Sequence, residues 1–469
     1  MSIWKIKKLD KLIADSVETE NGLKRSLSSR ALVALGIGAI IGAGLFSLTG
    51  IAAADHAGPA VILSFALAAL ACAFAGLCYA EFASMIPVAG SAYTYSYATM
   101  GEFVAWIIGW DLVLEYALSA ATVSVSWSSY LNELLISLNI HLPKELINSP
   151  SDGGWVNLPA IFIVCLLSLA LLRGTRESLT INNILVIIKV AVIILFIILG
   201  WKFINPANLE PFIPENTGVR GEFGWSGIAA GAALLFFAFV GFDAVSTAAQ
   251  EAKNPQKGMP IGILGSLVIC TILYVVFSYV MTGLVPYTEF KGDASPAITA
   301  FKVTGYEWIQ TLLTVAILAG YTSVILVMLL GQSRVFYSMS IDGLLPKMFS
   351  DIHKKFRTPW KTNLFFLGFV SIFAGFVPIK ELGHMVSIGT LFAFTLVCIG
   401  IIIMRKKMPD APRKFRVPFV PVIPILGALI CVFLMGSLNI DSWIRLIIWL
   451  TIGVVIYFCY GKKNSKVEN

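Results

Sequence analysis

The stretch GIGAIIGAGLF, residues 36–46, carries four glycines inside the first long apolar segment of the chain. A helix in lipid tolerates an open backbone only where that backbone is surrounded by protein or lines a cavity. A second apolar segment, FFAFVGFDAVS at residues 236–246, carries a similar interruption. Such a pair of interrupted segments predicts a binding site of the kind found in secondary transporters.

The composition is that of a membrane protein, because 57% of the 469 residues are hydrophobic and 13% are charged. An apolar run of about 20 residues is long enough to cross the hydrocarbon core. Such runs recur from end to end and predict about twelve transmembrane helices, with no separate soluble domain. They lie at 30–52, 58–86, 100–127, 157–172, 182–200, 227–248, 261–285, 309–338, 362–378, 382–404, 418–437 and 442–460.

The net charge of +7 indicates orientation in a membrane rather than binding to nucleic acid. Basic residues are concentrated at both ends and in every second loop, and the loops between them hold few. Because cytoplasmic loops are enriched in lysine and arginine, we expect both termini in the cytoplasm and a location in the plasma membrane. The predicted divisions are a cytoplasmic segment at 1–29, a transmembrane domain at 30–460 within a lipid bilayer, and a cytoplasmic tail at 461–469.

Cysteine and histidine spacing predicts no metal ion and no cofactor. All seven cysteines fall within apolar spans, where packing is the ordinary role of a thiol, and the four histidines are scattered. No nucleophile–base pair is visible either, so we do not expect an enzyme.

The two interrupted segments begin two blocks of five spans each, at about 30–200 and about 227–404. An odd number of spans inverts the second block relative to the first. The sequence therefore predicts an all-α polytopic membrane protein with a five-plus-five inverted repeat. Two additional helices follow at about 418–460.

The first break is centred on three small residues in a row, Gly42, Ala43 and Gly44, which allow the helix to open. An opened helix presents free amide groups with partial positive charge on one side and free carbonyls on the other. These two ends match the α-carboxylate and the α-ammonium that all amino acids share. The alternative is close helix packing through small residues, as at Gly38 and Gly42.

In the second break, residues 237–241 would present carbonyls beside the first break. The aromatic side chain of Phe237 could close over a ligand from outside, although an ordinary core or lipid-facing aromatic is the alternative. Asp243 follows in the same span, where a carboxylate usually faces protein or water.

Lys189 is the most informative buried charge, since it stands within NNILVIIKVAVIILFIILG at residues 182–200. A desolvated lysine can load and release a proton near neutral pH. The alternative is that it snorkels to the interface about two turns away. Glu115 follows Asp111 by one turn in the third span, so both lie on one helix face. Glu115 is either a pocket-lining acid or a structural carboxylate joining neighbouring helices.

Several stretches resemble the amino acid–polyamine–organocation superfamily, and within it the bacterial members of the cationic amino acid transporter subfamily. They are GIGAIIGAGLF, YAEFASMIPVAGSAYTYSY (79–97), FFAFVGFDAVSTAAQEAKNPQKGMP (236–260) and GQSRVFYSMSIDGLLP (331–346). The resemblance covers residues from about 28 to 460 with the motifs in order. It implies the five-plus-five (LeuT-type) fold, with the substrate held midway across the bilayer.

The resemblance also implies roles for individual residues. Backbone at Ile40, Ile41, Gly42, Ala43 and Gly44 would hold the head group of the amino acid. Carbonyls of the second break would take the ammonium, beneath Phe237 as a gate; these belong to Phe237, Ala238 and Val240.

Lys189 matches the fifth-helix lysine of the family, whose ammonium replaces a coupling sodium and bridges to the first helix. Glu115 matches a third-helix acid linked to the pocket. Tyr321 falls where the side-chain pocket is formed. Asp243, Thr322 and Ser323 are expected to be gate or structural residues.

Two departures from the family pattern limit what the resemblance implies. Ala43 stands where a hydroxyl residue is common, and Ile341 replaces the usual arginine of the MSRDG element. Tyr321 is also bulky for a pocket that takes a long cationic side chain. We therefore expect neutral L-amino acids of small or medium size.

Together these observations predict an importer of L-amino acids driven by protons, with alternating access. One alternative is an obligate amino acid exchanger on the same fold, with Lys189 in a structural role. Another is a sensor that binds amino acids without moving them. The sequence does not specify the preferred amino acid, the stoichiometry or the oligomeric state.

Overall fold

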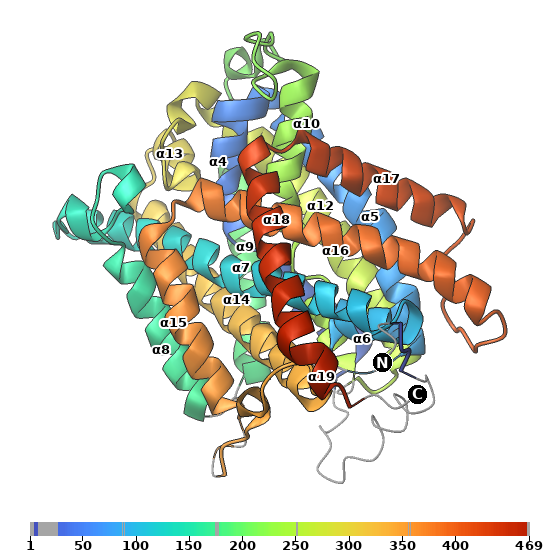
Figure 1. The fold of residues 1–469 in the computed structure, drawn as a ribbon. Helices are drawn as coiled ribbons and strands as arrows, with labels where there is room; N and C mark the ends of the chain where they lie inside the picture. Colours follow the sequence, from blue (N-terminus) through green and yellow to red (C-terminus); the bar gives the residue numbers. More distant parts are fainter. Residues whose placement is uncertain are drawn as a thin grey trace.

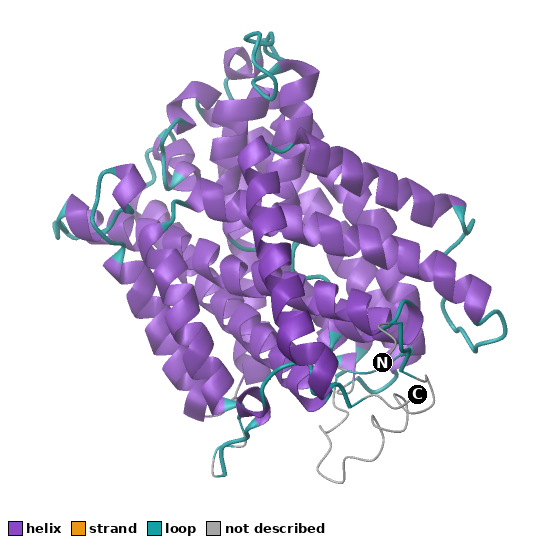
Figure 2. Ribbon diagram, viewed as in Figure 1, coloured by secondary structure: helices purple, strands orange, loops and turns teal. Residues whose placement is uncertain are grey.

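The computed structural model describes residues 4–7, 27–86, 88, 90–173, 178–249, 252–354, 356 and 358–466. Within this part the chain is helical, and Figure 2 shows helices joined by loops without strands. The expectation of an all-α polytopic fold is confirmed. Much of the predicted segment 1–29 lies outside the described residues.

Every predicted span corresponds to helix in the structure. Within the described residues, eight helical segments are long and apolar enough to cross a membrane, and four apolar helices are shorter. The helices are α2 (Ser29–Ile40), α3 (Ala43–Phe46), α4 (Leu48–Ala52), α5 (Val61–Met85), α7 (Glu102–Ser137), α8 (Leu158–Arg173), α9 (Ser178–Trp201), α10 (Gly224–Leu235), α11 (Ala244–Thr247), α12 (Pro255–Leu284), α14 (Glu307–Ile341), α15 (Trp360–Phe376), α16 (Ile379–Lys407), α17 (Val422–Ser437) and α18 (Ile440–Ile456).

Some short helices were not predicted. α6 (Ser91–Thr99) lies between the second and third spans, and α13 (Pro296–Lys302) lies in the loop after α12. α6 is bounded by Gly90 and Gly101, whose φ angles of +143° and +104° favour glycine. All nine residues of α6 are buried, although many are polar. Its mixed composition is the reason that an apolar pattern does not reveal it.

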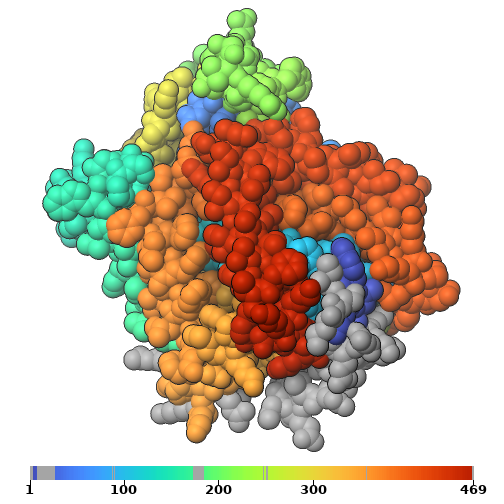
Figure 3. Space-filling model, in the orientation of Figure 1, coloured from blue at the N-terminus to red at the C-terminus, as the bar shows by residue number. Residues whose placement is uncertain are grey.

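Burial separates a central group of helices from a peripheral one. The most apolar window of the segment from α10 to α11 is completely buried, whereas that of α18 is 22% buried. Figure 3 shows α18 as a column on the outside of the molecule. Its outward side chains include Ile440, Ile447 and Ile448, which are suited to lipid contact. The interrupted helices therefore lie at the centre of the bundle.

The two chain ends lie on the same face, and the loops after α7, α9 and α12 lie on the opposite one (Figure 1). Near the N-terminus, the carbonyl of Lys5 accepts a hydrogen bond from the amide of Glu102 at the start of α7 (2.9 Å). Near the C-terminus, the amide of Lys466 donates to the carbonyl of Asp342 after α14 (3.0 Å). Both tails thus pack on one face of the bundle, at the start of α7 and at the end of α14.

Candidate functional site

The first span is interrupted where the glycine-rich stretch predicts. α2 ends at Ile40, and α3 begins at Ala43. Ile41 is extended (φ −72°, ψ 106°), and Gly42 has φ −155° and ψ −146°. Because the chain leaves helical geometry there, the first amides of α3 and the last carbonyls of α2 lack their usual helical partners.

The sixth span is interrupted in a corresponding way. α10 passes into a tight turn at Phe236–Phe239, and the chain is then extended at Val240 (φ −57°, ψ 133°). Gly241 follows with φ +114°, a conformation that side chains rarely adopt. A Cβ atom at Gly241 would also lie 2.9 Å from the carbonyl oxygen of Ala39. Glycine is required here for both reasons, since the second break passes directly against α2.

The two breaks touch each other. A Cβ atom at Gly44 would lie 2.3 Å from Cα of Ala238, so no side chain fits between α3 and the turn after α10. Gly42 differs, because its nearest neighbours are the side chains of Val324 in α14 (3.4 Å) and Val123 in α7 (3.9 Å). The structure therefore makes Gly44 a contact between the two breaks and leaves more room beside Gly42.

Tyr274, in the middle of α12, joins the two breaks through its hydroxyl. Its oxygen lies 3.0 Å from the carbonyl oxygen of Ile40 and 3.0 Å from that of Ala238. The side chain is fully buried. Sequence reasoning missed this residue, because the same span holds several other hydroxyl side chains and nothing distinguishes Tyr274 among them. One of the carbonyls expected to take a ligand ammonium is therefore occupied by a tyrosine.

The other two carbonyls expected to bind a ligand ammonium, those of Phe237 and Val240, differ in their hydrogen bonding. That of Phe237 accepts a hydrogen bond from the amide of Val240 at 3.1 Å. No donor to the Val240 carbonyl is found among the described residues. The Phe237 side chain is buried and makes no ring–ring contact within the described part of the chain.

Lys189 of α9 reaches into the bundle and contacts the first break. Its Nζ donates to the carbonyl of Gly38 at 2.8 Å and to that of Ile41 at 3.1 Å. The side chain is 2% exposed, and its methylene carbons pack against Gly320 of α14. In this conformation the lysine does not snorkel; its ammonium satisfies two carbonyls that the opened helix leaves free.

On the side of α3 remote from the termini, two tyrosines close over the break. The Tyr130 hydroxyl donates to the carbonyl of Phe46 at 2.6 Å, and the Tyr321 hydroxyl lies 3.1 Å from Oγ of Ser47. The two rings meet edge to face, with centroids 5.5 Å apart. Tyr321 was predicted to border the side-chain pocket; Tyr130 was not predicted.

Beyond these tyrosines lies a cavity of about 460 Å³. It opens towards the face remote from the termini, and its lining includes Ile51 of α4 and Val125 and Ser129 of α7. Charged groups at its rim include Asp293 and a Lys380–Asp55 ion pair (2.5 Å). The cavity has the position of a vestibule above the two breaks.

On the side towards the termini, Asp243 follows the second break. Its Oδ2 accepts hydrogen bonds from the hydroxyls of Tyr116 and Ser91, the latter at 3.3 Å. Glu115 directly precedes Tyr116 in α7 and is buried. It is about two helical turns along α7 from Val123, the residue of α7 nearest Gly42. Glu115 is thus placed at the second break rather than at the first.

The two remaining predicted residues, Thr322 and Ser323, form side-chain hydrogen bonds within their own helix. The hydroxyl of Thr322 donates to the carbonyl of Leu318 at 2.8 Å, and that of Ser323 donates to the carbonyl of Gly320 at 2.9 Å. Within the described residues, no three histidine, cysteine, aspartate or glutamate side chains are placed to hold a metal ion.

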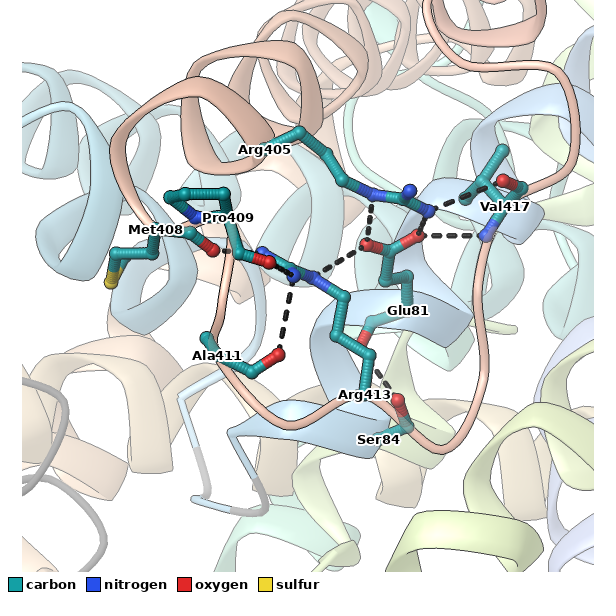
Figure 4. A network of polar contacts seen from close by, with 8 residues as sticks. All are labelled: Glu81, Ser84, Arg405, Met408, Pro409, Ala411, Arg413 and Val417. Atoms are coloured by element: carbon teal, nitrogen blue, oxygen red, sulfur yellow. Dashed lines mark hydrogen bonds and ion pairs between the residues drawn. The ribbon is translucent and has the colours of Figure 1, made fainter.

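A second buried charge cluster lies at the end of α5, away from the breaks (Figure 4). Nε and Nη2 of Arg405 donate to the two oxygens of Glu81 at 2.8 and 2.7 Å. Nε of Arg413 lies 3.3 Å from Oε1 of Glu81, and the amide of Val417 donates to Oε2 at 2.7 Å. The cluster ties α5 to the loop between α16 and α17.

A bundle of apolar helices in which two central helices are broken side by side, with a buried lysine on one break, defines a secondary transporter. The chain belongs to the amino acid permease family, a part of the amino acid–polyamine–organocation superfamily: residues 27–457 match the family profile described as "Amino acid permease". The resemblance seen in the sequence is confirmed. A permease is not an enzyme, in agreement with the sequence.

Individual relatives cover the whole chain. It is 47% identical to "Branched-chain amino acid permease BcaP" of Bacillus subtilis (strain 168), over 100% of this chain and 99% of that protein. It is 45% identical to "Methylthioribose transporter" of the same organism, over 99% of both chains. It is 30% identical to "Cationic amino acid transporter 4, vacuolar" of Arabidopsis thaliana, over 100% of this chain and 97% of that protein.

Proposed function

We propose that the chain imports neutral L-amino acids across the plasma membrane by proton symport. The observation that carries this proposal is the pair of hydrogen bonds from Lys189 to the carbonyls of Gly38 and Ile41. A charged ammonium stabilises these free carbonyls, and a deprotonated amine, which keeps only two N–H groups and no charge, does so less well. Loading and unloading of one proton therefore changes how firmly the first break is held.

The substrate is proposed to lie beside Gly42, where an added Cβ atom would meet only the side chains of Val324 and Val123. The amides at the start of α3 take its carboxylate, and the carbonyl of Val240 takes its ammonium. Tyr321 borders the side-chain pocket together with Tyr130, and their rings separate the substrate from the vestibule. A pocket closed by two tyrosines favours an apolar side chain of modest size over a long cationic one.

The direction of import follows from the proposed orientation. Both ends of the chain are basic and lie on one face of the molecule. We place this face in the cytoplasm. Substrate then enters from the vestibule, passes beneath Tyr130 and Tyr321, and leaves along the side of α11. The bundle alternates between openings to the two faces while Lys189 exchanges its proton.

The names of two relatives favour two different substrates. "Branched-chain amino acid permease" agrees with a neutral amino acid, whereas methylthioribose has neither an ammonium nor a carboxylate. Competition against radiolabelled L-isoleucine in proteoliposomes separates them. We expect L-leucine and L-valine to compete and methylthioribose to be ineffective. Strong inhibition by methylthioribose alone would reverse the assignment.

Coupling is tested by uptake into empty proteoliposomes under an imposed pH gradient, acidic outside. We expect unmodified protein to accumulate L-isoleucine, and Lys189→Ala to lose uphill uptake while retaining some downhill exchange. Lys202→Ala, an exposed lysine at the end of the same helix region, serves as the matched control. Undiminished uphill uptake by Lys189→Ala would rule out the coupling role. Uptake only into preloaded vesicles would show an obligate exchanger.

A further inference from the structure

A second hollow lies on the outside of the bundle, between the start of α12 and the loop that joins α16 to α17. Its volume is about 440 Å³. The lining includes Lys257, Pro260, Ile261 and Leu264 of α12, and Lys414 and Phe415 of the loop. This hollow, which we call the α12 groove, shares no lining residue with the vestibule. It is therefore separate from the proposed path of the substrate.

The loop side of the α12 groove is held in place at two points. Nε of Arg413 lies 3.3 Å from Oε1 of Glu81, and the amide of Val417 donates to Oε2 of the same carboxylate at 2.7 Å (Figure 4). Lys414 and Phe415 lie between these two attachments. Because both ends of this short segment are fixed on α5, the groove is formed before a ligand binds, which lowers the entropy cost of binding.

The α12 side of the groove is apolar and continues along the helix. Ile261 is exposed, and so are Val268 and Ile272 on the same helix. Counted from Ile261, the positions of Leu264, Val268 and Ile272 are three, seven and eleven residues further on, which places all four side chains on one helix face. An apolar stripe therefore leads from the groove towards the middle of the membrane, where an acyl chain would lie.

Two positive charges lie where the groove begins, at the terminus-facing end of α12. Lys257 and Lys414 are both exposed. None of the ion pairs found in the described part of the chain includes either of them. The neighbouring carboxylate of Glu81 is already bound by Arg405 and Arg413. The groove thus combines a positive rim with an apolar floor, which is complementary to an anion attached to a hydrocarbon chain.

We propose that the α12 groove binds an anionic phospholipid from the leaflet that faces the chain termini. The phosphate lies between the ammonium groups of Lys257 and Lys414, and one acyl chain covers Ile261 and Leu264. Basic pockets at the membrane surface of helical bundles bind anionic lipid head groups in this manner. A zwitterionic phospholipid has its own positive group beside the phosphate, so it gains less from two lysines. The bound lipid connects α12 with the loop between α16 and α17.

Native mass spectrometry of the detergent-purified protein tests this proposal. The protein is titrated with phosphatidylglycerol or with phosphatidylcholine of the same acyl chains, and the affinity of the first bound lipid is measured. We expect phosphatidylglycerol to bind more tightly than phosphatidylcholine. The double variant Lys257→Gln/Lys414→Gln should bind phosphatidylglycerol about 30-fold more weakly, because both lysines lose their attraction to the phosphate. Equal affinity of the unmodified protein for the two lipids would overturn the proposal.

The matched control is Lys406→Gln/Lys463→Gln, which removes the same charge from the terminus-facing side. Both lysines are exposed, and neither lines the α12 groove. This variant should bind phosphatidylglycerol as the unmodified protein does. Equal weakening in the two double variants would show that the lipid responds only to the overall positive charge, and the groove would then be rejected as the site.

Two further measurements separate a lipid from a free anion. Glycerol 3-phosphate carries the phosphate without acyl chains, and we expect it to bind far more weakly than phosphatidylglycerol. Equal affinity for the two compounds would show a site for small anions and would contradict the proposal. Phosphatidylglycerol should also raise the unfolding temperature of the unmodified protein more than that of Lys257→Gln/Lys414→Gln, since a ligand stabilises the folded state that binds it. An equal rise in both proteins would count against the groove.

Discussion

Tyr274 shows how one hydroxyl can hold two interrupted helices together. Its oxygen is 3.0 Å from a carbonyl on each break, so its single proton is shared between the two carbonyls in the centre of the bundle. Lys189 performs a similar task for two further carbonyls of the first break. The breaks are therefore stabilised by neighbouring side chains, as unpaired backbone groups in a membrane must be. In the proposed mechanism only the lysine changes charge.

At this scale we predict the effect of Tyr274→Phe. Removal of the hydroxyl takes away the one donor that two buried carbonyls share, which should cost about 1–3 kcal/mol of stability and lower the rate of transport. The measurements are thermal unfolding in detergent and initial uptake rates. Tyr279→Phe, on the same helix, keeps its ring contact with Trp201 and should behave as the unmodified protein. Equal behaviour of the two variants would show that the bridge has no role.

Sequence reasoning singled out residues whose type is unusual for their surroundings. A lysine or a glycine cluster inside an apolar run stands out, and Lys189 does lie on the first break. Tyr274 and Tyr130 do not stand out, because their role depends on which distant helices they meet. Glu115 was recognisable as a buried acid, but Asp243, to which the adjacent Tyr116 donates a hydrogen bond, lies 128 residues later in the chain.

Among the elements, the long apolar spans were predictable and the short polar helix was not. The apolar runs of about 20 residues agree with the helices because a membrane leaves the backbone few other options. α6 is buried despite its serine, threonine and tyrosine content. It is covered by α7 and α16, so tertiary contacts rather than its own pattern decide its burial. Helix ends also differ, and α7 continues to Ser137, ten residues beyond the predicted edge.

The contact between α5 and the loop after α16 leads to a prediction at this scale. Glu81→Gln removes the charge that Arg405 and Arg413 share, and the Arg413 side chain is only 2% exposed. Loss of one partner from a buried ion pair costs about 3–5 kcal/mol. We expect a clearly lower unfolding temperature for the detergent-purified variant.

The control is Glu133→Gln, since the exposed pair with Lys302 contributes about 0–1 kcal/mol. If both variants unfold at the same temperature, the Glu81 cluster does not stabilise the junction of α5, α16 and α17.

For the whole molecule, the charge distribution and the position of the vestibule indicate the same orientation in the membrane. The chain ends meet one face, where α7 begins and α14 ends, and the vestibule opens to the other (Figure 1). The proposed path runs from the vestibule, past the two tyrosines and the breaks, to the side of α11. Lys189, the proposed proton site, contacts Gly38 and Ile41 on the terminus-facing side of the tyrosines. This order suits a transporter that takes up substrate and protons from the vestibule face.

This polarity is tested by labelling introduced cysteines in intact cells with a membrane-impermeant thiol reagent. Trp155 is 72% exposed in the loop after α7, and Lys414 is exposed in the loop after α16. We expect Trp155→Cys to be labelled from outside and Lys414→Cys only after permeabilisation. The unmodified protein, whose exposed Cys459 lies near the C-terminus, provides the background signal. Labelling of Lys414→Cys alone in intact cells would invert the proposed orientation.

The central claim is that two broken helices offer their free peptide groups to the head group of an amino acid. An experimental structure determined with saturating L-isoleucine tests it most directly. We predict density for the ligand beside Gly42, with its carboxylate at the amides of residues 42–44 and its ammonium at the carbonyl of Val240. Density that lies elsewhere, with residues 36–46 forming one continuous helix, would contradict the account.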